Sequence, residues 1–515
     1  MSATLLDLLA AGADAAPAIA ATADAGPADA PLSYADLRAL AGRTVAQLNA
    51  HGIGRGDRVA IVLRNGPEMA AAFVAVGAGA TTAPLNPAYR ADEYRFYLED
   101  LGARALIVEA GSTSPAVAVA RDLGIPVLPL AVPPGLPAGS FTLPDPPADA
   151  VFAARPGPAA PDDVALVLHT SGTTSRPKIV PLSHANVCAS ARHVGATLAL
   201  TADDRCLNVM PLFHIHGLIA AVLSSLGAGA SVVCTPGFNA LRFFAWLSDV
   251  APTWYTAVPT MHQAILARAG RNPEAVAAAR LRFVRSSSAS LPPQVMAALE
   301  ETFGCLVIES YGMTEAAHQM ASNPLPPAPR MAGTVGIAAG PEVAIMAPDG
   351  AFLEAGATGE VVIRGPNVTA GYENNPQANA EGFAHGWFRT GDQGVMDADG
   401  YLTITGRLKE IINRGGEKIS PREVDEVLLD HPAVAQAVTF ARPHPKLGED
   451  VAAAIVREDG AEVDEPALRA FAAERLADFK VPRTIVFLDE IPKGATGKLQ
   501  RIGLADKLGL TEAAS

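Results

Sequence analysis

The chain has 515 residues, 49% of them hydrophobic, and its 53 acidic residues outnumber its 39 basic ones to give a formal net charge of -14. This length exceeds one ordinary hydrophobic core and predicts two or more domains, and the hydrophobic content argues against a largely disordered chain. The acidic balance argues against a general affinity for nucleic acid or anionic membranes, so any polyphosphate must be bound locally.

The N-terminus and the cysteines indicate the compartment. Residues 1–22 contain Asp7 and Asp14 but no basic residue, so they lack the positive start of a secretory signal. No apolar run reaches membrane-spanning length without glycine or charge. The four cysteines are widely spaced and form no C-x-x-C pair, which disfavours a disulfide framework or a zinc ribbon. We therefore expect a soluble, cytoplasmic protein.

Short apolar segments, rich in β-branched residues, alternate with alanine-rich segments of helical length. The apolar segments are residues 59–63, 105–108, 164–168, 231–234 and 306–309. This alternation predicts an α/β fold with buried sheets. Residues 52–57 partly resemble a dinucleotide-binding fingerprint, but they precede their strand and are predicted to form a turn. The segment 131–163 is rich in proline, alanine and glycine and predicts a long surface connection within the large domain.

The pattern changes after residues 406–410, where the last ~105 residues are long enough for a small independent domain. Ser420, Pro421 and Glu423 predict a helix start there, with a hydroxyl cap, a first-turn proline and a capping-box glutamate.

A hydroxyl-rich loop, residues 168–178, follows the apolar run 164–168 and ends in Lys178. Its hydroxyls, backbone donors and fixed cation suit the oxygens of a polyphosphate. It is not a Walker loop, because Lys178 is preceded by Pro177 and followed by Ile179. Its serine-x-x-lysine lacks the partner motifs of penicillin-binding enzymes. A polar turn between secondary-structure elements is the simpler alternative.

Four further segments have compositions that core packing does not require: residues 311–315, 389–392, 406–409 and 492–498. With the loop, in this order, they resemble the adenylate-forming superfamily of acyl-CoA synthetases, peptide-synthetase adenylation domains and luciferases. The resemblance spans nearly the whole chain. It implies a large multi-layer α/β N-terminal domain (1–406), a hinge (407–409) and a small mobile α+β domain (410–515), with the active site between the domains.

The chemistry of this superfamily explains these residue types. A carboxylate is a poor acyl donor, so its attack on the α-phosphorus of ATP first forms an acyl adenylate and pyrophosphate, and the thiol of coenzyme A then displaces AMP. Both steps build negative charge on oxygen, which fixed donors, lysine and Mg²⁺ stabilise.

The resemblance implies roles for the nucleotide-side residues. Thr314 would lie near the α-phosphate and Glu315 would bind Mg²⁺, a hard cation that prefers oxygen ligands. As structural alternatives, Thr314 could cap a helix and Glu315 could be its N-terminal charge. The β- and γ-phosphates would be held by Ser171, Gly172, Thr173, Thr174 and Lys178.

The resemblance also assigns the nucleoside. Asp392 would accept from the ribose hydroxyls and Arg407 would donate to the same sugar. Tyr311 would stack on adenine, and Gly312 would allow close backbone approach. Ser288 and Ala289 would complete this side of the site. Without the family order, Asp392 is a turn aspartate after a glycine.

In the C-terminal domain, Lys498 would reach the reacting carboxylate and the α-phosphate, although an exposed lysine is usually only solvated. Lys409 would be the hinge, about which the domain turns between the two steps. Gly415 and Gly416 would then lie beside the coenzyme A tunnel.

The acid is indicated by residues 285–290 and 316–324, which are rich in hydroxyls and include a histidine where a fatty-acid pocket would be apolar. These segments look most like the oxalate–CoA ligases of plants and fungi, so a small polar acid is favoured. The candidate contacts, in falling order, are His214, His318, Ser288 and Arg285. His214 and His216 could alternatively be metal ligands on one face of a strand, but no third ligand is evident. Instead, His214 is interpreted as a gate residue and His216 as packing.

Other functions remain open on this pattern: a malonate, methylmalonate or short-chain acyl-CoA synthetase, a carrier-loading enzyme, an oxidase, or a non-catalytic adenylate binder. The expected partners are a small carboxylate, ATP and coenzyme A, with no nucleic acid and no membrane insertion, in a monomer or homodimer.

Overall fold

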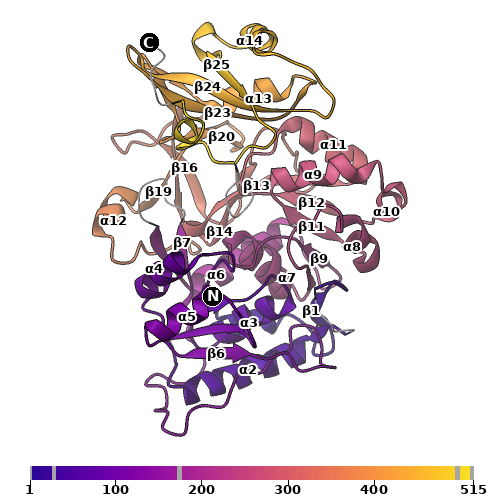
Figure 1. The fold of residues 1–515 in the computed structure, drawn as a ribbon, viewed down its shortest axis with the longest axis vertical. Coiled ribbons are helices and arrows are strands. Elements are labelled where there is room, and N and C mark those ends of the chain that lie inside the picture. Colours follow the sequence, from indigo (N-terminus) through magenta and orange to yellow (C-terminus); the bar gives the residue numbers. More distant parts are fainter. Residues whose placement is uncertain (1–2, 26–29, 171–176, 493–498, 511–515) are drawn as a thin grey trace.

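Two large sheets form the N-terminal part of the protein (Figure 1). The computed structural model describes residues 3–25, 30–170, 177–492 and 499–510. The nine-stranded sheet runs, in spatial order, β15 (Ile337–Ala338), β14 (His318–Ser322), β13 (Leu306–Met313), β12 (Phe283–Ser286), β11 (Trp254–Ala257), β9 (Arg205–Asn208), β10 (Ser231–Cys234), β1 (Pro17–Ala21) and β2 (Leu32–Ser33). From β13 to β1 neighbouring strands are parallel.

The second sheet has six strands: β6 (Val127–Leu130), β5 (Ala105–Glu109), β3 (Arg58–Val62), β4 (Thr81–Pro84), β7 (Val164–Thr170) and β8 (Lys178–Ser183). Only the pair β7–β8 is antiparallel in this sheet. All five apolar segments singled out in the sequence fall in strands, namely β3, β5, β7, β10 and β13. Parallel strands covered on both faces are nearly continuous in hydrophobic residues, which is why the sequence identifies them.

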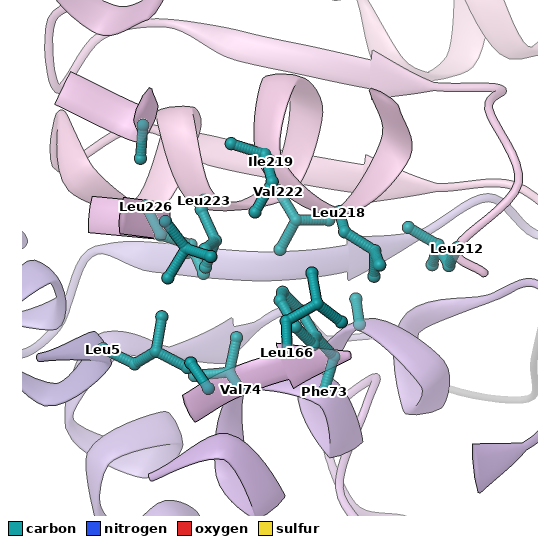
Figure 2. Close-up of a cluster of buried hydrophobic side chains, with 14 of the residues drawn as sticks. Leu5, Phe73, Val74, Leu166, Leu212, Leu218, Ile219, Val222, Leu223 and Leu226 are labelled. Carbon is teal, nitrogen blue, oxygen red and sulfur yellow. The ribbon is translucent and has the colours of Figure 1, made fainter. Parts of the chain in front are cut away.

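Helices α3 (Pro67–Gly77) and α6 (His184–Thr197) and the π-helix η1 (His216–Leu223) lie between the two sheets. Figure 2 shows Leu218, Val222 and Leu223 of the π-helix facing the cluster that contains Phe73 and Leu166. This apolar packing fixes the π-helix, whose first residue is His216. The helix beside them, α7 (Ser224–Gly227), continues directly from the π-helix.

Other helices cover the outer faces. Helices α4 (Ala91–Leu101) and α5 (Pro115–Asp122) pack on the six-stranded sheet. The outer face of the nine-stranded sheet is covered by α8 (Phe243–Val250), α9 (Pro259–Ala269), α10 (Pro273–Ala278) and α11 (Pro293–Phe303). At the N-terminal end of the chain lie α1 (Leu5–Leu9) and α2 (Tyr34–Ala50), and α2 packs on α3. The segment 131–163 carries no helix or strand, as predicted, and Val151 and Phe152 in it are exposed.

A third, antiparallel sheet contains β16 (Glu342–Met346), β17 (Thr358–Arg364), β18 (Phe383–Ala384), β19 (Trp387–Met396) and β20 (Leu402–Arg407), with α12 (Pro376–Gly382) beside it. The C-terminal sheet contains β21 (Ile412–Arg414), β22 (Glu417–Ile419), β23 (Val434–His444), β24 (Gly448–Arg457) and β25 (Thr484–Phe487). It has hydrophobic clusters of its own and is covered by α13 (Pro421–Leu429), α14 (Glu465–Ala473) and α15 (Leu504–Lys507).

The predicted helix start at Ser420 is present, since the Ser420 hydroxyl accepts from the amide of Glu423 at 3.4 Å. In the predicted capping box the Glu423 carboxylate would also accept from the backbone amide of Ser420, but it does not make this bond. The carboxylate accepts from Lys480 Nζ at 2.6 and 2.7 Å instead, because an ammonium is the stronger partner. None of the helices in the described part of the chain is long and apolar enough to cross a membrane.

Candidate active site

The β7–β8 hairpin places Lys178 opposite Thr170, at the end of β7. The predicted phosphate-binding residues Ser171, Gly172, Thr173 and Thr174 lie outside the described residues, as does Lys498. Lys178 is half-buried, and its Nζ lies 4.3 Å from the centre of the Tyr372 ring. Because an aromatic face attracts a cation, Tyr372 holds the lysine at the exit of the loop.

Glu315 lies directly after β13, in a 3-10 turn formed by Thr314–Ala316. Its side chain is buried, and its Oε1 accepts a hydrogen bond of 2.7 Å from the hydroxyl of Tyr372. Its backbone carbonyl accepts from the amide of Thr369, also at 2.7 Å. One tyrosine therefore contacts both Lys178 and Glu315. The alternative in which Thr314 caps a helix is wrong, because the cap position is Met313 and no side chain caps this short 3-10 turn.

Glu315 supplies the hard oxygen donor that Mg²⁺ requires. In the described part of the chain, no group of three or more histidine, cysteine, aspartate or glutamate side chains could hold a metal by itself. A magnesium ion at Glu315 would thus take its other ligands from phosphate and water, as this ion commonly does. The residues present fit such a site.

Asp392 and Arg407 are register partners on β19 and β20. Arg407 Nε lies 3.0 Å from Asp392 Oδ1, and the hydroxyl of Tyr311 donates to Asp392 Oδ2. The aspartate is buried whereas the arginine is nearly half exposed, and the aspartate raises the pKa of Arg407. The structure thus brings together the three side chains predicted to contact the nucleoside. A Cβ added at Gly312 would lie 2.0 Å from the His318 carbonyl oxygen, so close strand packing already requires this glycine.

Two of the predicted acyl-side residues, Ser288 and His318, lie at the ends of strands in the nine-stranded sheet. Ser288 follows β12, and His318 begins β14. Both have backbone conformations that glycine prefers, with φ of 74° at Ser288 and 103° at His318. Such strain is typical of functional sites, where the surrounding structure enforces it. Ala289 is exposed beside Ser288.

A cavity of about 50 Å³ lies between the two sheets' strand ends, and His214 and Thr314 both line it. His214 Nδ1 accepts from the backbone amide of His216 at 3.3 Å, so the proton of the neutral ring lies on Nε2. The remaining lining residues include Asn86, Tyr89, Tyr97, His169 and Phe213. His169 in turn contacts Asp100 at 3.1 Å.

The alternative that places His214 and His216 on one face of a strand as metal ligands is wrong, because residues 211–214 form a turn and His216 begins the π-helix. The interpretation of His216 as a packing residue agrees with its full burial, but the ring also makes polar contacts: its Nδ1 lies 3.0 Å from Ser288 Oγ and its Nε2 lies 2.6 Å from Thr256 Oγ1.

Arg285 lies behind His216 and does not line the cavity, and Ser288 and His318 are not among its lining residues either. It is fully buried, with Nη1 3.4 Å from both His216 Nε2 and Thr256 Oγ1, and Nη2 3.3 Å from Gln319 Oε1. Burial lowers the pKa of Arg285 to about 9, which leaves it charged at neutral pH. The expectation that Arg285 touches the acid directly is therefore wrong, because the side chain is fully buried behind His216.

Comparisons with known proteins identify the family. The family model described as AMP-binding enzyme matches residues 10–373, and the model described as AMP-binding enzyme C-terminal domain matches residues 423–498. The chain belongs to the AMP-binding enzyme family. Relatives of this AMP-binding enzyme include an Oxalate–CoA ligase of Arabidopsis thaliana, 48% identical over 91% of this chain and 92% of that protein. An Oxalate–CoA ligase of Saccharomyces cerevisiae is 41% identical over 93% of each.

Among solved structures, ATP-bound MatB from Rhodopseudomonas palustris resembles this AMP-binding enzyme with a TM-score of 0.87. It is 31% identical, and the match covers 98% of this chain and 99% of that one. The predicted superfamily, the α/β fold with a small C-terminal domain, and the enzyme class, an AMP-forming acid–thiol ligase, are confirmed. The expected use of ATP and coenzyme A is supported by the same matches.

The residues predicted to form the hinge and to lie beside coenzyme A are in exposed connections. Lys409 is exposed between β20 and β21. Gly415 and Gly416 form the turn of the β21–β22 hairpin with φ of 61° and 101°. Positive φ at both positions is what a tight hairpin turn requires, so the turn alone accounts for these two glycines.

Sequence reasoning missed Tyr372, Thr256 and Gln319. Tyr372 lies in a loop, 57 residues from the Glu315 side chain it contacts, and no periodicity predicts that pairing. Thr256 is the polar residue of an otherwise apolar strand, which is the available sequence signal for it. Gln319 lies within the polar segment 316–324, but nothing in that segment indicates its contact with Arg285.

Proposed function

We propose that this enzyme is an oxalate–CoA ligase. Oxalate attacks the α-phosphorus of ATP to give oxalyl adenylate and pyrophosphate, and the sulfur of coenzyme A then attacks the acyl carbon and releases AMP. The observation that carries the choice of acid is the polar acyl end, where His214 lines a small cavity and Ser288 is backed by buried His216 and Arg285. An alkyl chain there would place apolar groups against these polar side chains, which is unfavourable. The names of two relatives support the same acid.

On the nucleotide side, Asp392 and Arg407 would bind the ribose and Tyr311 would lie against the base. Thr314, in the cavity wall with His214, would approach the α-phosphate. Lys178 would bind the departing phosphates with Ser171, Gly172, Thr173 and Thr174. Glu315 would hold Mg²⁺, which when bound would neutralise phosphate charge.

Lys498 would act only in the first step, where its cation offsets the charge of the approaching carboxylate and phosphate oxygens. We assign residues 1–406 to the N-terminal domain, 407–409 to the hinge and 410–515 to the mobile domain, with Lys409 absorbing the rotation. Gly415 and Gly416 would meet coenzyme A after that rotation. We also assign the enzyme to the cytoplasm, since all four cysteines are free thiols, three of them buried.

The test is coenzyme A-dependent AMP formation with oxalate, malonate, methylmalonate, acetate, benzoate and octanoate. We expect oxalate to have the highest kcat/KM. A clear preference for octanoate would refute the polar-pocket argument, whereas a preference for malonate would retain the dicarboxylate class and change the acid. ATP–pyrophosphate exchange with any of the acids separates an enzyme from a non-catalytic adenylate binder.

A further inference from the structure

Arg285 is a buried cation without a carboxylate partner in the described part of the chain. Its side chain is fully buried, its Nε has no hydrogen-bond partner there, and the atoms around it are neutral acceptors. The Gln319 amide is fixed by donating to Thr197 Oγ1 at 3.0 Å and to the Ala339 carbonyl at 3.1 Å, which turns its oxygen toward Arg285. Burying an uncompensated guanidinium is costly, so its position calls for a reason.

The contacts of Arg285 lead to Ser288 through two side chains. Thr256 and Arg285 are register partners on the parallel strands β11 and β12, so their side chains share one face of the sheet. Thr256 Oγ1 lies 2.6 Å from His216 Nε2, and His216 Nδ1 lies 3.0 Å from Ser288 Oγ. Ser288 is half-buried, at the edge of the polar cluster.

The direction of these hydrogen bonds follows from donor chemistry. Arginine can only donate, so Thr256 Oγ1 accepts from Arg285 Nη1. The Thr256 hydroxyl is buried and has no other hydrogen-bond partner among the described residues, so its own proton must point to His216 Nε2. The opposite direction would leave that proton without an acceptor, a cost that buried polar groups avoid. The second contact of Arg285 Nη1, to His216 Nε2, also requires a lone pair on that nitrogen.

With Nε2 as an acceptor, the neutral His216 ring carries its proton on Nδ1 and donates to Ser288 Oγ. The proton of Ser288 is then available to a ligand.

We propose that Arg285, Thr256 and His216 are positioning residues that orient the Ser288 hydroxyl as a donor to the bound acid, and so select acids with a second carboxylate. The chain of hydrogen-bond donors begins at Arg285, which cannot accept a hydrogen bond, and ends at the second carboxylate of the acid, which can only accept. This inference rests on the proposed function for its substrate and refines how that substrate is chosen.

The test compares oxalate with glyoxylate, an acid of the same carbon count that lacks the second carboxylate. Ser288→Gly removes the donor and suits the backbone, because φ is 74° there. We expect this variant to lower kcat/KM for oxalate about 10- to 100-fold, the range for a lost hydrogen bond to a charged group, with glyoxylate changed less than about threefold. Arg285→Met, of similar length, should give a similar selective loss.

The double variant distinguishes positioning from general damage. If Arg285 acts through Ser288, Arg285→Met should lower oxalate kcat/KM less than about twofold in the Ser288→Gly background. Multiplicative losses, or equal losses with oxalate and glyoxylate, would overturn the proposal. Ser290→Ala, which removes an exposed hydroxyl two residues away, is the matched control and should leave the selectivity unchanged.

A second measurement does not depend on the substrate or on the folding of the Arg285 variant. In wild-type enzyme labelled with ¹⁵N-histidine, and with His216→Gln used for assignment, the ring proton of His216 should be on Nδ1. A proton on Nε2 would overturn the donor chain. If the wild-type enzyme forms no AMP with oxalate, the proposed function is overturned. If the enzyme is active with oxalate but His216 carries its proton on Nε2, or the losses of kcat/KM multiply in the double variant, only the donor chain is overturned.

Discussion

Tyr372 links Lys178, which ends the loop proposed to bind phosphate, to the carboxylate proposed to bind Mg²⁺, and Tyr372→Phe separates these two contacts. The variant keeps the ring whose centre lies 4.3 Å from Lys178 Nζ. It removes only the hydroxyl that donates to Glu315 Oε1 at 2.7 Å. Burial, and then the Glu315 charge, raise the pKa of Tyr372, so the hydroxyl stays protonated and remains a donor throughout the working pH range.

The size of the effect follows from the surroundings of Glu315. Its carboxylate is 6% exposed, so water replaces the lost donor poorly. A hydrogen bond to a charged group contributes about 1.5–3 kcal/mol, and losing such a partner of a metal ligand commonly weakens metal affinity about 10- to 100-fold. We therefore expect the half-saturating Mg²⁺ concentration to rise about 10- to 100-fold in Tyr372→Phe.

The assay is oxalate-dependent ATP–pyrophosphate exchange as a function of Mg²⁺, with ATP saturating. At high Mg²⁺ the Phe variant should recover to within a few-fold of wild type. Tyr372→Leu removes the ring as well and should also raise the KM for ATP about 2- to 30-fold, from a cation–π contribution of about 0.5–2 kcal/mol. Tyr401→Phe controls for the loss of a tyrosine hydroxyl, here one that donates to the Pro329 carbonyl. An unchanged Mg²⁺ dependence in Tyr372→Phe, or a loss that excess Mg²⁺ does not relieve, would refute the reasoning.

Two further predictions concern the domain rotation and a buried acid. Lys498→Ala should abolish ATP–pyrophosphate exchange yet leave coenzyme A transfer from supplied oxalyl adenylate largely intact, and equal loss of both half-reactions would contradict the division of labour. Burial raises the pKa of Glu309 from 4.5 to about 7, so the stability gained from the protonated acid is present below pH 4.5 and is lost as pH rises through 7. Relative to Glu309→Gln, wild type should therefore lose about 3 kcal/mol of unfolding free energy between pH 4 and pH 8. Denaturant unfolding at both pH values tests this, and a pH-independent difference would count against it.

The sequence identifies the strands and the nucleotide motifs because both are local signals. A parallel strand covered on two faces must be apolar along its length, as in residues 231–234 and 306–309. The pair predicted to bind the nucleoside depends on similarly local structure: Asp392 and Arg407 lie on adjacent antiparallel strands, so one hairpin brings them together.

The acyl side could not be predicted in the same way, because its contacts join residues far apart in the chain. His216 meets Ser288 across 72 positions and Thr256 across 40. The position of His216 depends on how the π-helix packs between two sheets, which is tertiary structure and leaves no local signal in the sequence. The same limit explains the error over Arg285: its sequence neighbours indicate polarity near the acid, but only the strand register shows that the guanidinium lies behind His216.

The backbone at Ser288 and His318 gives an independent reason to connect this polar cluster with function. Glycine would adopt a positive φ without strain at either position, whereas a residue with a Cβ incurs about 1–3 kcal/mol. Packing gives no reason to keep a serine hydroxyl at a half-buried, strained position whose partner is a buried histidine. The strain is offset if the hydroxyl and imidazole bind a charged ligand, since each hydrogen bond to such a ligand contributes a free energy of similar size. The strained backbone and the one-way donor chain from Arg285 therefore point to the same conclusion, that this pocket is built to bind an anion.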